Sequence, residues 1–268
     1  MIPLLLAPLA ILYSLFFLWP MVQVVVLSLQ RTNFMVSSFV GFSNYIETFQ
    51  EPAFWLSIVN SFFYALIMIP ANIFISFTLA CFLYRFTKRW RNTARIVFYI
   101  PTLSAGIIIA GFWKWLFHTE GVINWILNAS INWFGQGITA VPVISAIVVT
   151  GTVGGTLIIT LASIEAIDTG MIDAAKIDGA SWGQIKRYII LPTIMPTIAL
   201  IALLAWIGAW QIIETPMMLA PQDYAATLTY HIYRQGFLFG KYGLASAQAV
   251  ILLCIISTLS LIKRRVQQ

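Results

Sequence analysis

Ile172-Asp173-Ala174-Ala175-Lys176-Ile177-Asp178-Gly179-Ala180-Ser181 is a charged stretch, followed shortly by Ile189-Ile190-Leu191-Pro192. It is an insert between two long apolar runs, at roughly 141–164 and 194–214. Polar groups between membrane-length segments need a protein partner or water. The insert therefore predicts a surface on which another molecule docks.

The insert has the local signals of two short helices separated by a turn. Asp168 can cap the first helix, because its carboxylate accepts from unpaired amides at the positive end of the helix dipole. Gly179 can end that helix, since glycine adopts a left-handed backbone without steric cost. Ser181 followed by Gln184 is a capping-box pattern for the second helix, and Pro192 limits where that helix continues. We predict a helix-turn-helix elbow over 168–192.

Composition places the rest of the chain in a membrane. Sixty per cent of its 268 residues are apolar and 9% are charged, against about 25% charged in soluble domains. A helix that spans the bilayer takes about 20 apolar residues. Six windows qualify, which predicts an all-α integral membrane protein with one transmembrane domain over 1–268: 3–29, 57–84, 96–117, 141–164, 194–214 and 242–262. The first run is too long for a signal-peptide core and is expected to remain as a span.

The net charge of +6 indicates how the chain is oriented in the membrane and does not indicate nucleic-acid binding. Basic clusters lie between the second and third spans, between the fourth and fifth, and after the sixth. Their members are Arg85, Lys88, Arg89, Arg91, Arg95, Lys176, Lys186, Arg187, Lys263, Arg264 and Arg265. The positive-inside rule predicts that this side, with the elbow and both termini, is cytoplasmic.

The elbow also resembles a known motif. Its spacing is that of the Glu-Ala-Ala coupling motif. Asp173-Ala174-Ala175 is followed after three residues by Gly179, after nine more by Ile189, and after one more by Leu191-Pro192. That motif is typical of permease subunits of bacterial ATP-binding-cassette (ABC) importers. The segment Asp178-Gly179-Ala180-Ser181 is similar to the carbohydrate-uptake branch, which includes maltose and glycerol-phosphate permeases. Trp19-Pro20, Val40–Tyr45, Trp113–Phe117 and Thr227–Arg234 extend the likeness over nearly all of the chain.

The chain departs from the family pattern at three positions. Asp173 stands where the family usually has Glu, which changes the reach of any ion pair with a partner. Asp168 stands where Pro is common, and Thr150 where Trp is common. None of the three alters the spacing of the motif.

The resemblance implies a type I ABC importer permease fold in the bacterial cytoplasmic (inner) membrane, without enzymatic activity of its own. It implies a second permease subunit, expected to form a heterodimer, two ATPase subunits and an extracytoplasmic solute-binding protein. The chain would supply half of the pathway for a mono- or oligosaccharide or a polyol. It has no phosphate-binding loop, so ATP and Mg²⁺ would be bound by the ATPase subunits, with no cofactor or metal here. The implied ATPase-coupling residues are Asp173, Ala174, Ala175, Asp178, Gly179, Ala180, Ile189, Leu191 and Pro192.

Polar residues inside spans are candidates for the substrate pathway. In the fourth span Thr152, Thr156, Thr160 and Ser163 share one helical face, and Thr152 and Thr156 are nearer mid-membrane. Close helix packing, with hydroxyls bonded to their own helix, explains this stripe as well.

The fifth span offers a different chemistry. Gly208 and Gln211 lie one turn apart, flanked by Trp206 and Trp210. An amide bonds sugar hydroxyls and an indole stacks on a sugar ring, and the resemblance favours Gln211 as a pathway residue. The alternatives are an interhelical hydrogen bond for Gln211 and lipid or subunit contacts for the two Trp residues.

Prolines mark two further places where a span can bend. Pro70 interrupts the second span, and Pro101 opens the third, which makes Thr102 and Ser104 weaker pathway candidates. Glycerol phosphate or another small polar solute remains an alternative substrate. A self-sufficient secondary transporter is a less favoured class, because the acidic residues lie in loops or at span ends. A membrane enzyme lacks a catalytic cluster.

Overall fold

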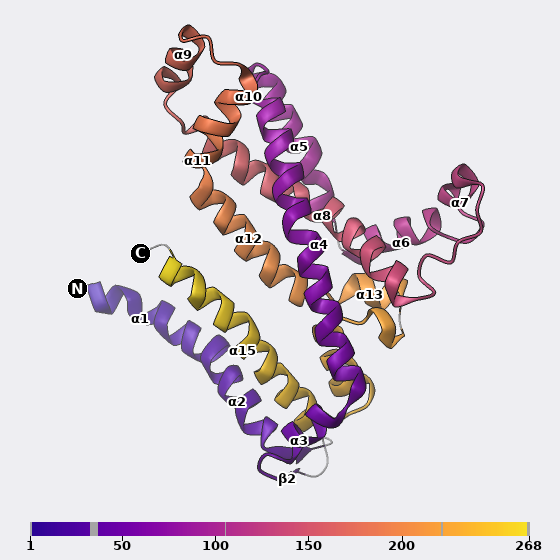
Figure 1. Cartoon of the computed structure of the whole chain (residues 1–268). Coiled ribbons are helices and arrows are strands. Elements are labelled where there is room, and N and C mark those ends of the chain that lie inside the picture. The colour runs from indigo at the N-terminus through magenta and orange to yellow at the C-terminus, as the bar shows by residue number, and fades with distance from the viewer. Residues whose placement is uncertain (1, 33–36, 105, 221, 267–268) are drawn as a thin grey trace. The chain divides into compact units, whose positions relative to one another are not determined.

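The computed structural model describes residues 2–32, 37–104, 106–220 and 222–266. Most of these residues are helical. They form two compact units, Met1–Val59 with Ala226–Gln268, and Asn60–Ala225 (Figure 1). Helix α4 (Pro52–Leu83) begins in the first unit and continues into the second.

The first unit joins the two ends of the chain. Helix α15 packs against α2 and α3, and Gly243 of α15 lies against the carbonyl of Gln30, where a side chain would collide. Strands β1 and β2 are antiparallel, with Gln30 opposite Phe39. The elements are α1 (Ile2–Tyr13), the π-helical turn η1 (Ser14–Leu18), α2 (Trp19–Ser28), β1 (Gln30–Thr32), β2 (Ser37–Phe39), α3 (Ser43–Gln50), α14 (Leu228–Tyr233), η4 (Arg234–Leu238) and α15 (Tyr242–Val266).

The second unit is built around α8 (Gly137–Glu165), the most buried of its long helices. Helix α5 packs along α8, α6 and α12 also contact it, and α13 lies on α6. The other elements are α5 (Lys88–Leu103), α6 (Gly106–Leu116), α7 (Val122–Leu127), α9 (Thr169–Ile177), α10 (Trp182–Ile185), η2 (Lys186–Ile190), α11 (Leu191–Thr193), α12 (Met195–Trp210), α13 (Glu214–Leu219) and η3 (Asp223–Ala225).

Several of these helices can cross a membrane. Among the described residues three single helices are long and apolar enough, Ala7–Ser28, Pro52–Leu83 and Gly137–Glu165. Two bent pairs raise the number to five: Lys88–Leu103 with Gly106–Leu116, bent by 91°, and Trp182–Thr193 with Met195–Trp210, bent by 69°. Helix α15 is apolar over the shorter stretch Tyr242–Thr258. All six predicted windows therefore fall on helices, although the windows at 96–117 and 194–214 are not single straight ones.

Of two expectations about prolines, the one about Pro70 was wrong. Pro70 does not interrupt the second span, because α4 continues through it without a break from Pro52 to Leu83. A proline inside a span is tolerated where neighbouring helices and local adjustments satisfy the freed backbone groups. Pro192 does lie near the end of its helix, which continues to Thr193 and breaks at Ile194, as predicted.

Candidate functional site

The first helix of the elbow, α9, has both of its predicted ends. The carboxylate of Asp168 accepts a hydrogen bond from the Gly170 amide at 2.9 Å. At the other end Gly179 has φ +80°, in the left-handed region. The Ala180 amide bonds the Ala175 carbonyl at 2.9 Å, and the Gly179 amide bonds the Lys176 carbonyl at 3.1 Å. This is a Schellman motif, which only glycine adopts without strain.

The second helix of the elbow begins as predicted. The Ser181 hydroxyl accepts from the Gln184 amide at 3.3 Å, and the Gln184 side chain accepts from the Ser181 amide at 2.7 Å. Both halves of the capping box are therefore present. Helical turns then run through Ile189, Leu191 and Pro192, so the elbow joins α12 at the bend near Ile194.

The elbow has a buried face and an exposed face. Ile172, Ile185 and Ile190 are at most 2% exposed and join a cluster with residues of α4 and α8, among them Cys81 and Leu161. By contrast Met171, Ile177 and Tyr188 of the elbow are exposed, Ile177 at 86%. The elbow is thus fixed to the helices behind it while it presents apolar side chains outward.

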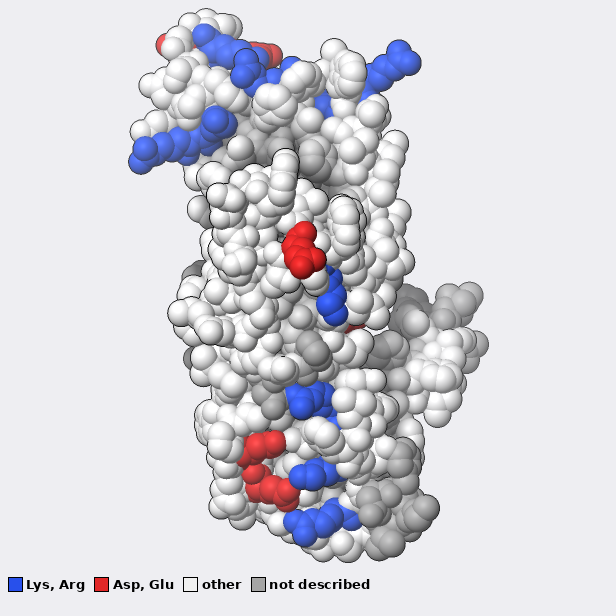
Figure 2. Space-filling model, turned by 90° about the vertical axis from the view of Figure 1, so that its right-hand side faces the viewer, with Lys and Arg blue, Asp and Glu red and all other residues white. Residues whose placement is uncertain are grey.

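Charge gathers at this end of the second unit. Figure 2 shows Lys and Arg over the end that α9 and α10 occupy. The ring of Tyr84, just after α4, stacks on Trp182 of α10, with centroids 6.3 Å apart. The basic clusters at 85–95 and 176–187 therefore lie at one end, as predicted, whereas the side chains at 263–265 lie outside what the structure describes.

Asp173 does not stand alone on the exposed face. Its carboxylate accepts from Lys176 at 2.7 Å, three residues later on the same helix, and both side chains are more than half exposed. The carboxylate that replaces the family's Glu is therefore neutralised locally. Ala174 and Ala175 supply the carbonyls that close the helix end, and Asp178 is its C-cap residue.

The polar stripe of α8 is hydrogen-bonded within the protein. Thr156 donates to the Val153 carbonyl of its own helix at 3.0 Å. Three others reach neighbouring helices: Thr152 donates to Asn72 at 3.1 Å, Thr160 to Ser76 at 3.4 Å, and Ser163 and Thr197 are 2.9 Å apart. The stripe thus fixes the packing of α8 against α4 and α12.

Three predicted pathway residues meet beside the stripe. Thr102, Ser104 and Thr152 line a pocket of about 210 Å³ at the break between α5 and α6. Gly106, Gly151 and Thr215 line it too, and Thr215 was not among the predicted pathway residues. The hydroxyl of Thr102 is buried without a hydrogen-bond partner in the described part of the chain. This hydroxyl lies beside Gly154 in the contact between α5 and α8, so Thr102 lines the pocket with its oxygen enclosed.

The fifth-span candidates lie outside that pocket lining. Gln211 follows the last residue of α12, so the helix ends earlier than the predicted span, which extended to 214. The backbone N–H of Gln211 donates to the Gly208 carbonyl at 3.0 Å. The side chain of Gln211 is exposed. Trp206 and Trp210 pack together with centroids 5.5 Å apart. Trp210 is buried, and the buried Trp206 Nε1 has no hydrogen-bond acceptor among the residues described.

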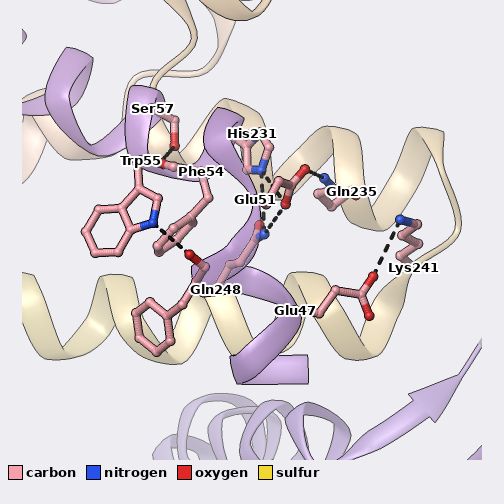
Figure 3. A network of polar contacts seen from close by, with 10 residues as sticks. Glu47, Glu51, Phe54, Trp55, Ser57, His231, Gln235, Lys241 and Gln248 are labelled. Carbon is pink, nitrogen blue, oxygen red and sulfur yellow. Dashed lines mark hydrogen bonds and ion pairs between the residues drawn. The ribbon is translucent and has the colours of Figure 1, made fainter. Parts of the chain in front are cut away.

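A separate polar network lies in the first unit, around the carboxylate of Glu51 (Figure 3). Gln235 and Gln248 donate to it at 2.6 and 3.2 Å, and Nε2 of His231 lies 3.4 Å away. The hydrogen bond from His231 lowers the pKa of Glu51, with smaller contributions from the charges of His231 and Lys241 and from Gln248, against desolvation. The carboxylate therefore stays ionised and ties α14, η4 and α15 to the start of α4.

The comparisons with known proteins cover the elbow, stripe and pocket together. Residues 72–268 match the binding-protein-dependent transport system inner membrane component. The chain belongs to this family. As a member of it, the chain is a multi-pass membrane permease.

Similar permeases share most of its length. The chain is 32% identical to the sulfoquinovosyl glycerol transport system permease protein SmoG of Agrobacterium fabrum (strain C58 / ATCC 33970), over 94% of this chain and 85% of SmoG. It is 26% identical to the lactose transport system permease protein LacF of Rhizobium radiobacter, over 96% and 90%.

Solved structures of ABC transporters have the same fold. All of this permease matches a chain of a bacterial ABC transporter involved in the import of the acidic polysaccharide alginate, with 96% of that chain covered, TM-score 0.81 and 25% identity. A structure of a bacterial alginate ABC transporter in complex with alginate pentasaccharide-bound periplasmic protein gives TM-score 0.83 at 22% identity, covering 95% of that chain.

Proposed function

We propose that this permease forms half of the translocation pathway of an ATP-driven, binding-protein-dependent importer for a carbohydrate. The observation that carries the proposal is the elbow, whose coupling-motif spacing folds around Gly179 into two capped helices with an exposed apolar face. The relatives named for sulfoquinovosyl glycerol and lactose support a solute that contains a sugar. An ATP-driven transporter whose permease chain has no phosphate-binding loop needs ATPase partners.

In this proposal the elbow contacts an ATPase subunit in the cytoplasm. Met171 and Ile177 would enter an apolar groove of that partner, while Asp173, paired with Lys176, would lie at the polar rim. The arrangement requires six spans with both termini cytoplasmic, a second permease, two ATPases that bind ATP and Mg²⁺, and an external binding protein. Nucleotide binding would favour one of two packings of the spans.

The solute would pass polar groups on both sides of the α5–α6 break. Thr102, Ser104 and Thr152 supply hydroxyls in the pocket, and Trp206 supplies a buried donor. A volume of about 210 Å³ is smaller than the roughly 300 Å³ of an ordinary ligand site. We therefore assign the pocket to a segment of the pathway that widens in the transporting state, with Gln211 and the Gly208 turn as a further segment.

Reconstitution tests this function. The complex with its second permease, ATPases and binding protein would be placed in vesicles and offered labelled mono- and oligosaccharides, polyols and glycerol phosphate. ATP-dependent uptake of a sugar that also shifts the melting of the binding protein is the expected result. Uptake of glycerol phosphate alone, or uptake without ATP, would replace the proposal by one of the other classes.

Gln211 gives a sharper test of the pathway. Gln211→Leu keeps similar volume and removes the amide, so uptake should fall while the complex assembles normally. The matched control is Gln136→Leu, since Gln136 lies outside α8 as its N-cap residue without a side-chain cap bond. Equal uptake by both variants and the wild type would remove Gln211 from the pathway.

A further inference from the structure

Behind the elbow lies a set of side chains that join it to α4 and α5, to which it is not directly connected in sequence, and to the end of α8. The set, here called the brace, consists of Tyr84, Arg91, Arg95, Glu165 and Trp182. It belongs entirely to the second unit. None of these residues is part of the coupling motif.

The brace begins with an aromatic stack on the elbow. Trp182 is the first residue of α10, directly after the Ser181 capping box. Its ring lies over Tyr84 with an interplanar angle of 6°, and the guanidinium of Arg91 lies 5.5 Å from the centre of the Tyr84 ring. Arginine favours such faces because its planar cation is attracted to the ring quadrupole.

The same arginine continues into an ion pair. Nε of Arg91 lies 3.2 Å from Oε1 of Glu165, the last residue of α8, and Arg95 pairs with Oε2 of the same carboxylate. Only 19% of the Arg91 side chain and 28% of the Glu165 side chain are exposed. An ion pair with this burial is screened less than one on the surface. The elbow, the end of α4, the start of α5 and the end of α8 are thereby joined.

From the brace two packed helices lead to the pocket. Arg91 and Thr102 are both on α5, about 16 Å apart at 1.5 Å per residue. Glu165 and Thr152 are both on α8, about 20 Å apart by the same rise. Between them the two helices touch at Gly154, where a side chain would overlap the Phe98 carbonyl. Helices in such close contact shift together, since packed cores have few voids that could absorb a displacement.

We propose that Arg91 is a positioning residue that clamps Trp182 of the elbow to the α5–α8 pair through Tyr84 and Glu165, so that movement of the elbow reaches the pocket. This inference rests on the proposed function, because it names the path by which ATPase movement reaches the solute. The elbow would then move four helices, α4, α5, α8 and α12, rather than only the two to which the chain connects it.

The test compares solute imported per ATP hydrolysed in reconstituted vesicles. Arg91→Gln should lower this ratio by about two- to fivefold, the range that corresponds to a cation–π contact at a partly exposed site. Arg89→Gln is the matched control, because it removes the same charge from an exposed position on the same turn of α5. Complex assembly and basal ATP hydrolysis should be equal in the two variants.

A second pair keeps the test decisive if Arg91→Gln fails to assemble. Trp182→Phe retains a ring for the stack and should keep the wild-type ratio, whereas Trp182→Leu should lower it; Trp90→Leu, at an exposed Trp nearby, should leave it unchanged. An unchanged ratio in Arg91→Gln and Trp182→Leu would overturn the brace. Absence of ATP-driven import by the wild type would instead overturn the proposed function, so the two failures are distinguishable.

Discussion

The elbow and the polar stripe of α8 use their polar side chains in different ways. In the elbow, Asp168 and Ser181 bond backbone amides two and three residues away, and Asp173 pairs with Lys176 on the same helix turn. In the stripe, Thr152 and Thr160 bond side chains of α4 that lie 80 and 84 residues away in sequence. The elbow therefore owes its shape to neighbours in sequence, and the stripe fixes distant helices against each other. A body of the first kind can move as a unit, whereas the second kind holds the spans in one of their packings.

Substitution of Gly179 should have a strong effect, because the turn of the elbow depends on its left-handed backbone. Gly179→Ala places a Cβ on a left-handed residue, at a cost of about 1–2 kcal/mol, which corresponds to a factor of roughly 5–30 in the population of the native turn. Uptake per ATP in reconstituted vesicles should fall accordingly, and a β-branched replacement such as Gly179→Val should lower it further.

Gly183→Ala is the control for that experiment. Gly183 lies inside α10, and an added Cβ would meet only the Ser181 hydroxyl at 3.9 Å. Its uptake should equal the wild type or exceed it slightly, because alanine favours the helix. Equal losses at both glycines would mean that space, rather than the backbone conformation at Gly179, determines coupling.

The hydrogen bonds between the stripe and α4 should each contribute less. The pair formed by Thr152 and Asn72 should have a coupling free energy of about 0.6 kcal/mol, the average for interhelical hydrogen bonds in membranes. A double-mutant cycle with Thr152→Val and Asn72→Leu, followed by unfolding in detergent, measures it. Thr156→Val is the control, since the Thr156 hydroxyl bonds a carbonyl of its own helix. A coupling free energy of zero between Thr152 and Asn72 would mean that the Thr152 hydroxyl does not hold α8 against α4.

Glu51 should affect the protein least, through the pH dependence of its stability. It belongs to the polar network of the first unit and to neither the elbow nor the stripe. Its folded-state pKa is lowered, chiefly by the hydrogen bond from His231, so its carboxylate stabilises the protein above the usual carboxyl pKa. That stabilisation is lost as pH falls through the lowered value. The melting temperature should therefore drop less between pH 7 and 3 in Glu51→Gln than in the wild type. An equal drop in both would assign the acid sensitivity to other groups.

The same difference explains what could be predicted from the sequence. The Asp168 cap, the left-handed Gly179 and the Ser181–Gln184 box all depend on residues within a few positions, and each was predicted correctly. The end of α12 before Gln211, and the uninterrupted course of α4 through Pro70, were not. Thr215 and Arg91 gave no local signal, because their roles depend on helices that meet only after folding.

The partners of the stripe hydroxyls could not be predicted from the sequence either. Spacing on α8 correctly placed Thr152 and Thr160 on one face, and both hydroxyls were expected to serve either a solute or packing. Only the tertiary structure supplies Asn72 and Ser76 as their partners. It also brings Thr102 and Ser104 beside Thr152, although they are about 50 residues apart in sequence.

The most direct test of the account asks what the exposed face of the elbow touches. Ile177→Cys, in a background where the exposed Cys254 is replaced by alanine and Cys81 stays buried, places a thiol at the outermost apolar position of α9. In the assembled complex this thiol should cross-link to an ATPase subunit, with a yield that changes between nucleotide-free and ATP-bound states. A thiol that instead reacts only with lipid-soluble reagents, and never with an ATPase, would show that the elbow lies on the membrane surface and does not drive transport.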